Sequence, residues 1–361
     1  MKRMFSLVAL AVLLCCACGG HSEPADLGGD IRIQKIYANP ATHSAFPSIV
    51  KFKGRYFVSF REGVSHIFDE NGNAEGHVRI ISSPDGKRWE SVADFGLPGF
   101  DLRDPKLSVT PDGRLMATVG GSIYREKKLV GRIPQVCFST DGKTFTDPQP
   151  IEVDPPVECP LGEWLWRVTW HEGVGYGVSY FMGELRLLST TDGVHYKEVS
   201  RPVPPDVAGK CTETTLRFLP DGRMILVVRR DPNPVPALMA VAAPPYTDWE
   251  WKTMTAYLGG PDVLVRPDAS LIVGGRYWFE AGKQCKTLLW KADTEGHMNA
   301  IVILPSAGDN SYPGFLVEGD ELWVCYYSSV EKLRKPGIFL ARMPLSLFEN
   351  TLKPVNCDWG D

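Results

Sequence analysis

Residues 47–60 read PSIVKFKGRYFVSF, two short apolar strands joined by a Lys-Gly turn. Apolar and polar residues alternate along the strands, which is the period of a β-strand with one buried face. The unit recurs at 104–119 (DPKLSVTPDGRLMATV), 167–180 (RVTWHEGVGYGVSY), 214–228 (TTLRFLPDGRMILVV), 261–275 (PDVLVRPDASLIVGG) and 312–327 (YPGFLVEGDELWVCYY). Successive units start roughly 45 to 65 residues apart, as expected for four-stranded propeller blades. The sequence therefore predicts an all-β fold, a six-bladed β-propeller.

A strand-like segment, IRIQKIYA at residues 31–38, precedes the first of these units. It has no partner of its own in the repeat. We predict that it forms the outer strand of the last blade and pairs there with IFLARM at residues 338–343. Such a pairing would close the ring with the two ends of the chain.

Three turn motifs follow the repeat: SPDGKRW at residues 83–89, STDGKTF at 139–145 and TTDGVHY at 190–196. In each, the aspartate can accept backbone N–H bonds, the glycine can take a positive φ and the aromatic ring can pack beneath the turn. The motifs resemble the Asp-box that joins the outer strands of sialidase blades. Because this motif also occurs in propellers that are not enzymes, we interpret these residues as structural.

The N-terminus is typical of an exported protein. Lys2 and Arg3 precede an apolar run at residues 4–14, which is too short to span a bilayer. Ala17 followed by Cys18 resembles a bacterial lipobox, which implies cleavage before Cys18 and lipidation of its thiol. The predicted organisation is a signal peptide at 1–18, a flexible tether at 19–30 and the propeller at 31–361. Lipidation at Cys16 and an ordinary cleaved signal peptide are the alternatives.

These features predict a lipid anchor in the bacterial cell envelope, on the outer membrane and facing the periplasm rather than the outside. The net charge of −4 and the lack of a basic stripe exclude a typical nucleic-acid-binding surface. After the predicted signal peptide, no C-x-x-C or H-E-x-x-H pattern and no phosphate-binding glycine loop is present, so we expect neither a metal site nor a cofactor. Six cysteines remain after the signal, which permits disulfides without predicting their pairing.

Polar side chains gather where a propeller binds ligands, at the starts of first strands and the ends of second strands. Arginine is frequent among them, and several arginines around one concave site suggest recognition of a carboxylate. Trp166 and Tyr326 could add aromatic contacts to a sugar. The predicted substrate-binding residues are Arg61, Arg103, Asp104, Trp166, Arg167, Arg229, Arg230, Arg276 and Tyr326.

Two further segments resemble the catalytic motifs of sialidases. The first is CTETTLRFLPDGRMILVVRR at 211–230, and the second is SYPGFL at 311–316. The resemblance implies that Tyr312 is the nucleophile, that Glu213 activates it, and that Arg229 or Arg230 binds the substrate carboxylate. Sialidases are glycosidases with a tyrosine nucleophile. A free tyrosine has a pKa near 10, so it needs a nearby base to attack as phenolate.

The sequence also departs from the sialidase pattern. Residues 45–48 read AFPS where that family has R-I-P-S, so the first arginine of its carboxylate-binding triad is missing. The general acid could be Asp69 or His66, both in the loop after the first unit. Arg276, in a G-G-R segment, is the candidate for the third arginine.

The predicted function is that of an exo-acting glycoside hydrolase that removes a terminal acidic sugar from a glycan. The missing arginine leaves two alternatives. One is a polysaccharide lyase that acts on uronates, with His66 or a tyrosine abstracting the α-proton. The other is a propeller that binds glycans without catalysis, since one fold serves many functions.

Overall fold

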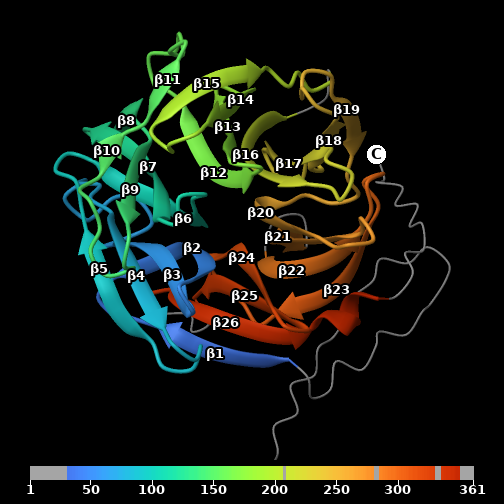
Figure 1. The fold of residues 1–361 in the computed structure, drawn as a ribbon. Helices are drawn as coiled ribbons and strands as arrows, with labels where there is room; N and C mark the ends of the chain where they lie inside the picture. Colours follow the sequence, from blue (N-terminus) through green and yellow to red (C-terminus); the bar gives the residue numbers. More distant parts are fainter. Residues whose placement is uncertain (1–30, 206–208, 280–283, 330–334, 350–361) are drawn as a thin grey trace, which may run out of the picture.

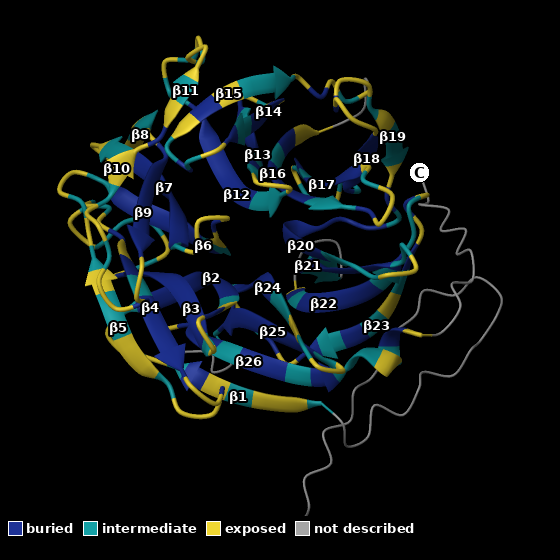
Figure 2. Ribbon diagram, viewed as in Figure 1, coloured by how far each residue is buried: buried dark blue, intermediate teal, exposed yellow. Residues whose placement is uncertain are grey.

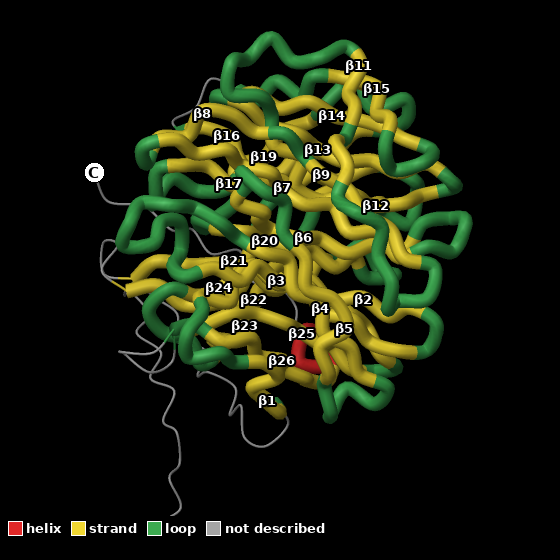
Figure 3. Tube along the Cα trace, turned by 90° about the vertical axis from the view of Figure 1, so that its left-hand side faces the viewer, coloured by secondary structure: helices red, strands yellow, loops and turns green. Residues whose placement is uncertain are grey.

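Six β-sheets, antiparallel except for the short strand β11 (Glu152–Asp154), are arranged in a ring around a central axis in the computed structural model of the protein (Figure 1). The structure describes residues 31–205, 209–279, 284–329 and 335–349. The predicted signal peptide, tether and lipidation site at Cys18 lie outside these ranges. Within them, strands account for nearly all regular structure and no α-helix occurs, only a 3₁₀ turn at η2 (Leu345–Phe348) (Figure 3). None of the described helical segments is long and apolar enough to span a membrane.

The first three blades follow the chain order. Blade 1 contains β2 (His43–Phe52), β3 (Arg55–Gly63), β4 (His77–Ser83) and β5 (Glu90–Phe95). Blade 2 contains β6 (Asp101–Val109), β7 (Leu115–Arg125), β9 (Gln135–Ser139) and β10 (Gln149–Pro150), with β8 (Lys128–Arg132) paired to β7. Blade 3 contains β12 (Trp164–His171), β13 (Val174–Phe181), β14 (Glu184–Thr190) and β15 (His195–Ser200), with β11 (Glu152–Asp154) parallel to β15.

The last three blades have four strands each. Blade 4 contains β16 (Lys210–Phe218), β17 (Met224–Asp231), β18 (Leu238–Ala242) and β19 (Glu250–Thr253). Blade 5 contains β20 (Gly259–Val265), β21 (Leu271–Phe279), β22 (Gln284–Ala292) and β23 (Met298–Leu304). Blade 6 contains β24 (Asn310–Glu318), β25 (Glu321–Ser328), β26 (Gly337–Pro344) and β1 (Arg32–Tyr37).

The ring is closed by the N-terminal strand, as the sequence predicts. β1 pairs antiparallel with β26, from Arg32 opposite Arg342 to Tyr37 opposite Ile338. The first strands of the six blades contact one another in turn, β2 to β6, β12, β16, β20, β24 and back to β2. The predicted six-bladed propeller is therefore confirmed, including the strand exchanged between the two ends of the chain.

The hydrophobic core lies between blades. Six clusters of buried apolar residues are present among the described residues, one at each contact between neighbouring blades. At the contact of blades 1 and 2, for example, Phe57 and Ile80 pack with Leu115 and Ala117. Figure 2 shows the result, with inner strands buried and the outer strands β1, β5 and β19 partly exposed. This packing holds the inner strands in fixed positions around the axis.

The three aspartate turns have the geometry expected from their sequence. The carboxylate of Asp85 accepts N–H bonds from Lys87 at 2.9 Å and from Arg88 at 3.0 Å. Asp141 and Asp192 accept equivalent bonds in blades 2 and 3. These bonds stabilise the ionised form and lower the pKa of Asp85 to about 2. All three turns lie at the outer strands, so their role is structural.

The described cysteines, Cys137, Cys159, Cys211, Cys285 and Cys325, are free thiols. Four of them are buried within the blades. Burial raises the pKa of the Cys137 thiol to about 12, so it stays protonated and unreactive. Blade packing therefore stabilises this part of the chain without disulfides.

Candidate active site

Every inner strand carries a β-bulge at the same height of the ring. The pairing shifts between residues 45 and 48 in β2, 103 and 106 in β6, 165 and 168 in β12, 211 and 214 in β16, 259 and 262 in β20, and 311 and 314 in β24. In four of these bulges the first residue has a positive φ and precedes a proline: Phe46, Asp104, Gly260 and Tyr312. Bulges re-aim side chains and often lie beside active sites. Here they place residues from six blades at one level of the axis.

Tyr312 and Glu213 meet at this level, although 99 residues separate them in the chain. The Tyr312 hydroxyl donates a hydrogen bond of 2.6 Å to Oε1 of Glu213. Nη1 of Arg229 donates to the other carboxylate oxygen at 2.6 Å and to the Tyr312 hydroxyl at 3.0 Å. The structure thus assembles the predicted nucleophile, its predicted base and one of the two predicted arginines.

The electrostatics of this group suit a phenol that is protonated at rest. Burial, followed by the negative charge of Glu213, raises the pKa of Tyr312 well above its ordinary value, and Arg229 acts in the opposite direction. Tyr312 is 7% exposed and Glu213 is 8% exposed. The proton of Tyr312 can therefore pass directly to Glu213, while the guanidinium of Arg229 stabilises the phenolate that remains.

The ring of Tyr312 is held from several sides. The ring of Phe46 lies 4.9 Å from it and that of Trp166 lies 6.3 Å away, centroid to centroid. A methyl group added to Gly260 would lie 2.6 Å from the Tyr312 ring, so only glycine fits at this contact. This close packing fixes the direction of the Tyr312 hydroxyl.

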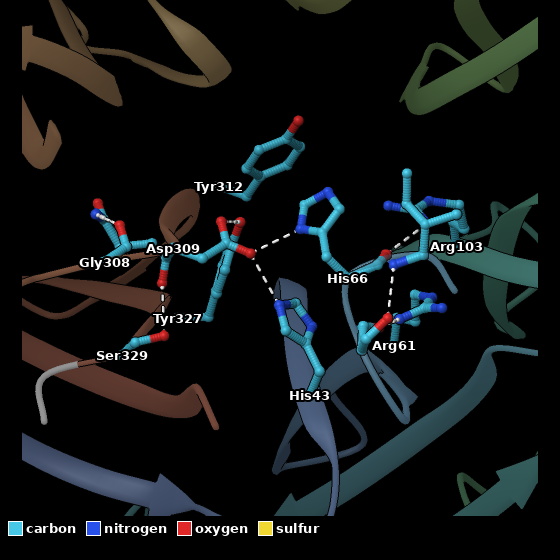
Figure 4. Close-up of polar contacts among 12 residues, drawn as sticks. His43, Arg61, His66, Arg103, Gly308, Asp309, Tyr312, Tyr327 and Ser329 are labelled. Atoms are coloured by element: carbon cyan, nitrogen blue, oxygen red, sulfur yellow. Dashed lines mark hydrogen bonds and ion pairs between the residues drawn. The ribbon is translucent and has the colours of Figure 1, made fainter. Parts of the chain in front are cut away.

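A second polar group lies beside Tyr312, centred on Asp309 (Figure 4). Oδ2 of Asp309 accepts hydrogen bonds from Nε2 of His43 at 2.8 Å and from Nδ1 of His66 at 2.7 Å. Oδ1 accepts from the Tyr327 hydroxyl at 2.7 Å and from Nη2 of Arg276 at 3.1 Å. Burial lowers the pKa of His43, so this imidazole is neutral at pH 7. The network fixes the orientation of the His66 ring. Asp309 contacts its Nδ1 and not its Nε2.

The same three residues, His43, His66 and Asp309, could offer one ligand atom each to a metal ion, within 4.8 Å of one another. A cation there would share the Asp309 carboxylate with the guanidinium of Arg276. The separations of 2.7 and 2.8 Å are also those of ordinary hydrogen bonds. We therefore interpret the group as a hydrogen-bond network.

The other predicted acid, Asp69, lies apart from Tyr312. Its carboxylate accepts a 2.7 Å bond from the backbone N–H of Asn73 within its own loop. It lines a pocket on blade 1 together with Glu62 and Arg79, and neither Tyr312 nor Glu213 borders that pocket. Its position therefore does not support the predicted role as general acid, which leaves His66.

Three of the predicted substrate-binding arginines are part of the framework. Arg61 is buried against Asp101 at 2.7 Å, and Nη1 of Arg103 donates to the same carboxylate at 2.9 Å. Arg167 pairs with Asp262 at 3.2 Å and donates to the backbone carbonyl of Pro313. The Arg61–Asp101 pair joins blades 1 and 2, and Arg167 reaches from blade 3 to blades 5 and 6, so substrate contact by Arg61 and Arg167 is not supported by their positions. Arg103 also donates to the carbonyl of His66 and thereby supports the His66 loop.

Four further predicted residues lie as follows. Nε of Arg230 donates to the carbonyl of Pro236 at 2.6 Å, so Arg229, not Arg230, contacts Tyr312. Trp166 is 1% exposed, and this burial does not support the predicted stacking on a sugar. Tyr326 is fully buried and donates to the carbonyl of Pro305, away from the axis. Asp104 is in a bulge, and its Oδ1 is buried with no hydrogen-bond partner among the described residues; burial raises its pKa.

Sequence reasoning gave no specific role to Asp309, His43 or Lys106. Lys106 is 3% exposed, and its Nζ lies 5.8 Å from the Tyr312 ring and 5.4 Å from that of Trp166. Burial, followed by the charge of Arg167, lowers its pKa to about 7. Asp309 directly precedes β24 and is three residues from Tyr312, and this proximity is the signal that could have identified it.

No protein-family model and no curated protein matches the chain. Among solved structures, a protein of unknown function from Dyadobacter fermentans aligns with a TM-score of 0.72 and 20% identity, covering 87% of this chain and 99% of that one. A Trypanosoma rangeli sialidase in complex with the inhibitor DANA aligns with a TM-score of 0.62 and 14% identity, covering 86% and 59%. The fold is that of the sialidase-like six-bladed β-propellers.

A glycosidase with a different name also matches. It is the α-L-arabinofuranosidase of Fusarium graminearum, solved as an E242A mutant with an iminosugar inhibitor, with a TM-score of 0.61, 15% identity and coverage of 87% and 96%. The chain therefore spans nearly the full length of this neighbour but about three fifths of the sialidase. At these identities the likeness establishes the shared fold.

Proposed function

We propose that this sialidase-like propeller is an exo-acting glycoside hydrolase with Tyr312 as its nucleophile. The observation that carries the proposal is the 2.6 Å hydrogen bond from Tyr312 to Glu213 within a site formed by several blades. Two of the matched structures support it, since they are named as a sialidase and an arabinofuranosidase. That the sugar is acidic, as the arginines suggest from the sequence, stays a prediction.

The reaction would proceed in two displacements. Tyr312 attacks the anomeric carbon as Glu213 takes the phenol proton, and a covalent glycosyl-tyrosine forms. The bond to the leaving oxygen breaks while Nε2–H of His66 protonates that oxygen. In the second half, His66 removes a proton from water, the water oxygen attacks the anomeric carbon, and Glu213 returns its proton to Tyr312. The sugar leaves with retained configuration, and both residues regain their starting protonation states.

The test is hydrolysis of a panel of aryl glycosides, both neutral and acidic, by the protein and its Tyr312→Phe variant. Release of aryl alcohol should fall by a factor on the order of 10³ or more when the nucleophile is lost. Tyr326→Phe is the matched control because, among the described residues, that hydroxyl bonds to the Pro305 carbonyl and not to the site, and its activity should stay within about twofold. Full activity of Tyr312→Phe would refute the tyrosine mechanism. An unsaturated product absorbing in the ultraviolet would identify a lyase instead, and binding without turnover would identify a glycan-binding protein.

We also propose that the protein is held in the bacterial cell envelope by a lipid on Cys18. The support is the sequence alone, and the propeller starts at β1 (Arg32–Tyr37), after the predicted tether. Cys18→Ser should move the protein from the membrane fraction to the soluble fraction of the cell. If Cys16→Ser does so and Cys18→Ser does not, the anchor is at Cys16.

A further inference from the structure

Asp309 is an ionised carboxylate built into the site. It accepts hydrogen bonds from four side chains, His43, His66, Arg276 and Tyr327. Against the effect of burial, the bonds from His43 and His66 lower its pKa far below the ordinary value. Its side chain is 28% exposed, so it borders the space that a ligand can enter. An ionised carboxylate of the protein, already in contact with Arg276 and His66, therefore borders the site next to Tyr312.

The arginines around the axis already pair with carboxylates of the protein. Arg229 pairs with Glu213 at 2.6 Å and with Asp231 at 2.9 Å, and Arg276 pairs with Asp309 at 3.1 Å. The framework pairs are Arg61 and Arg103 with Asp101, and Arg167 and Arg217 with Asp262. An incoming carboxylate would have to share a guanidinium with one of these carboxylates.

Arg276 shows how fully such a guanidinium is engaged. Its Nε and Nη2 donate to the carbonyl of Asn310 at 2.9 and 2.6 Å. Nη2 also donates to Asp309 and, at 2.8 Å, to the Tyr327 hydroxyl. At position 45, opposite Arg61 in the β2–β3 pairing, the chain has a buried alanine. The site therefore lacks one arginine, and each of the others already pairs with a carboxylate of the protein.

On these observations we infer that the sugar bound at Tyr312 is uncharged, because Asp309 already supplies the carboxylate that the arginines of this site hold. The inference rests on the proposed function and defines its substrate class. A second carboxylate beside Asp309 would be repelled, and such repulsion is a usual means of excluding a competing ligand. A neutral sugar offers hydroxyls that can donate to Asp309 and accept from Arg229. This conclusion departs from the acidic sugar that the arginines suggested from the sequence.

The experiment compares ligands that differ only at one carbon, as CH₂OH or carboxylate: aryl glucosides with glucuronides, and aryl galactosides with galacturonides. Binding is measured by calorimetry and hydrolysis by release of aryl alcohol. The protein should favour the uncharged member of the best-bound pair by at least about tenfold. Asp309→Asn, which removes the charge and keeps the shape, should shift that preference at least about tenfold toward the acidic member. Asp94→Asn, in a surface pair with Arg79, is the matched control and should leave the preference unchanged.

Two results would overturn the inference. One is a preference of the unaltered protein for the carboxylated member, and this result needs no variant to fold. The other is an Asp309→Asn variant, folded by its circular dichroism, whose preference equals that of the unaltered protein. Failure of the proposed function looks different. In that case the uncharged sugars bind but are not hydrolysed, whereas efficient hydrolysis of the acidic member would keep the function and reject the substrate class.

Discussion

Replacing Lys106 with methionine should remove a pH dependence from the stability of the propeller. The lysine is buried between Trp166 and Tyr312, and its pKa falls from 10.5 to about 7. In the unfolded chain it keeps an ordinary pKa. Between these two values the unfolded state binds more protons than the folded state, so the free energy of unfolding rises with pH. The rise begins near pH 7 and is complete above pH 10.5.

The magnitude follows from the shift. A lowering of 3.5 pKa units corresponds to a destabilisation of roughly 5 kcal/mol when the lysine is charged in both states. Between pH 7.0 and 8.5, linkage gives a gain in stability of about 1.6 kcal/mol from Lys106 alone. Lys106→Met has no group that titrates, and its unbranched side chain can occupy the same space. The gain should therefore be absent from the variant.

The assay is urea unfolding at pH 7.0 and 8.5, with the protein and Lys106→Met measured side by side. Other titrating groups are common to both proteins, so the difference between the two pH dependences isolates the lysine. Both pH values lie above the pKa of His43, so this histidine stays neutral throughout the measurement. Equal pH dependences, within about 0.3 kcal/mol, would show that Lys106 keeps an ordinary pKa in the folded protein and would refute the reasoning.

Two further substitutions test the framework of the site. Gly260→Ala should lower turnover about a hundredfold, because the added methyl displaces the Tyr312 ring by about 1 Å. Gly113→Ala is the control: this glycine also has a positive φ but has open space around it, so the variant should lose only about 1 kcal/mol of stability. Similar activity of the two variants would contradict the role of the contact between Gly260 and Tyr312. Asp101→Asn should lower the free energy of unfolding by about 3–5 kcal/mol, since it removes the negative charge that pairs with the buried Arg61. A loss below about 1 kcal/mol in urea unfolding would show that the fold does not depend on this ion pair.

The propeller could be predicted because its signals are local and repeated. Each blade carries its own strand period and turn residues, so six weak patterns support one another. The strand that closes the ring, β1 (Arg32–Tyr37), could be placed because it was the one strand-like segment without a partner in the repeat. In the site, Tyr312 and Glu213 were found through a resemblance that spans two short motifs, and the structure brings these residues into contact.

The partners of the arginines could not be predicted in the same way. Arg167 and Asp262 are 95 residues apart, and nothing in either segment indicates that they meet. A count of arginines at strand ends therefore suggested an anion site, whereas the geometry shows arginines that already pair with carboxylates of the protein. His43 and Asp309 received no specific role for the same reason, since 266 residues separate them. The bulges had a visible but unused signal, the prolines that follow Phe46, Asp104, Gly260 and Tyr312 in four of the six inner strands.

The strand that closes the ring also sets an order for biosynthesis. β1 (Arg32–Tyr37) is made before any blade, but its partner β26 (Gly337–Pro344) is made after all of them. During that interval the segment must stay unpaired without joining another chain. Arg32 and Lys35 remain exposed even in the finished ring, and such charges on an edge strand discourage intermolecular pairing. Blade 6, which carries Tyr312, is complete only when this first-made segment docks, so a nascent or N-terminally trimmed chain should have an unfinished active site.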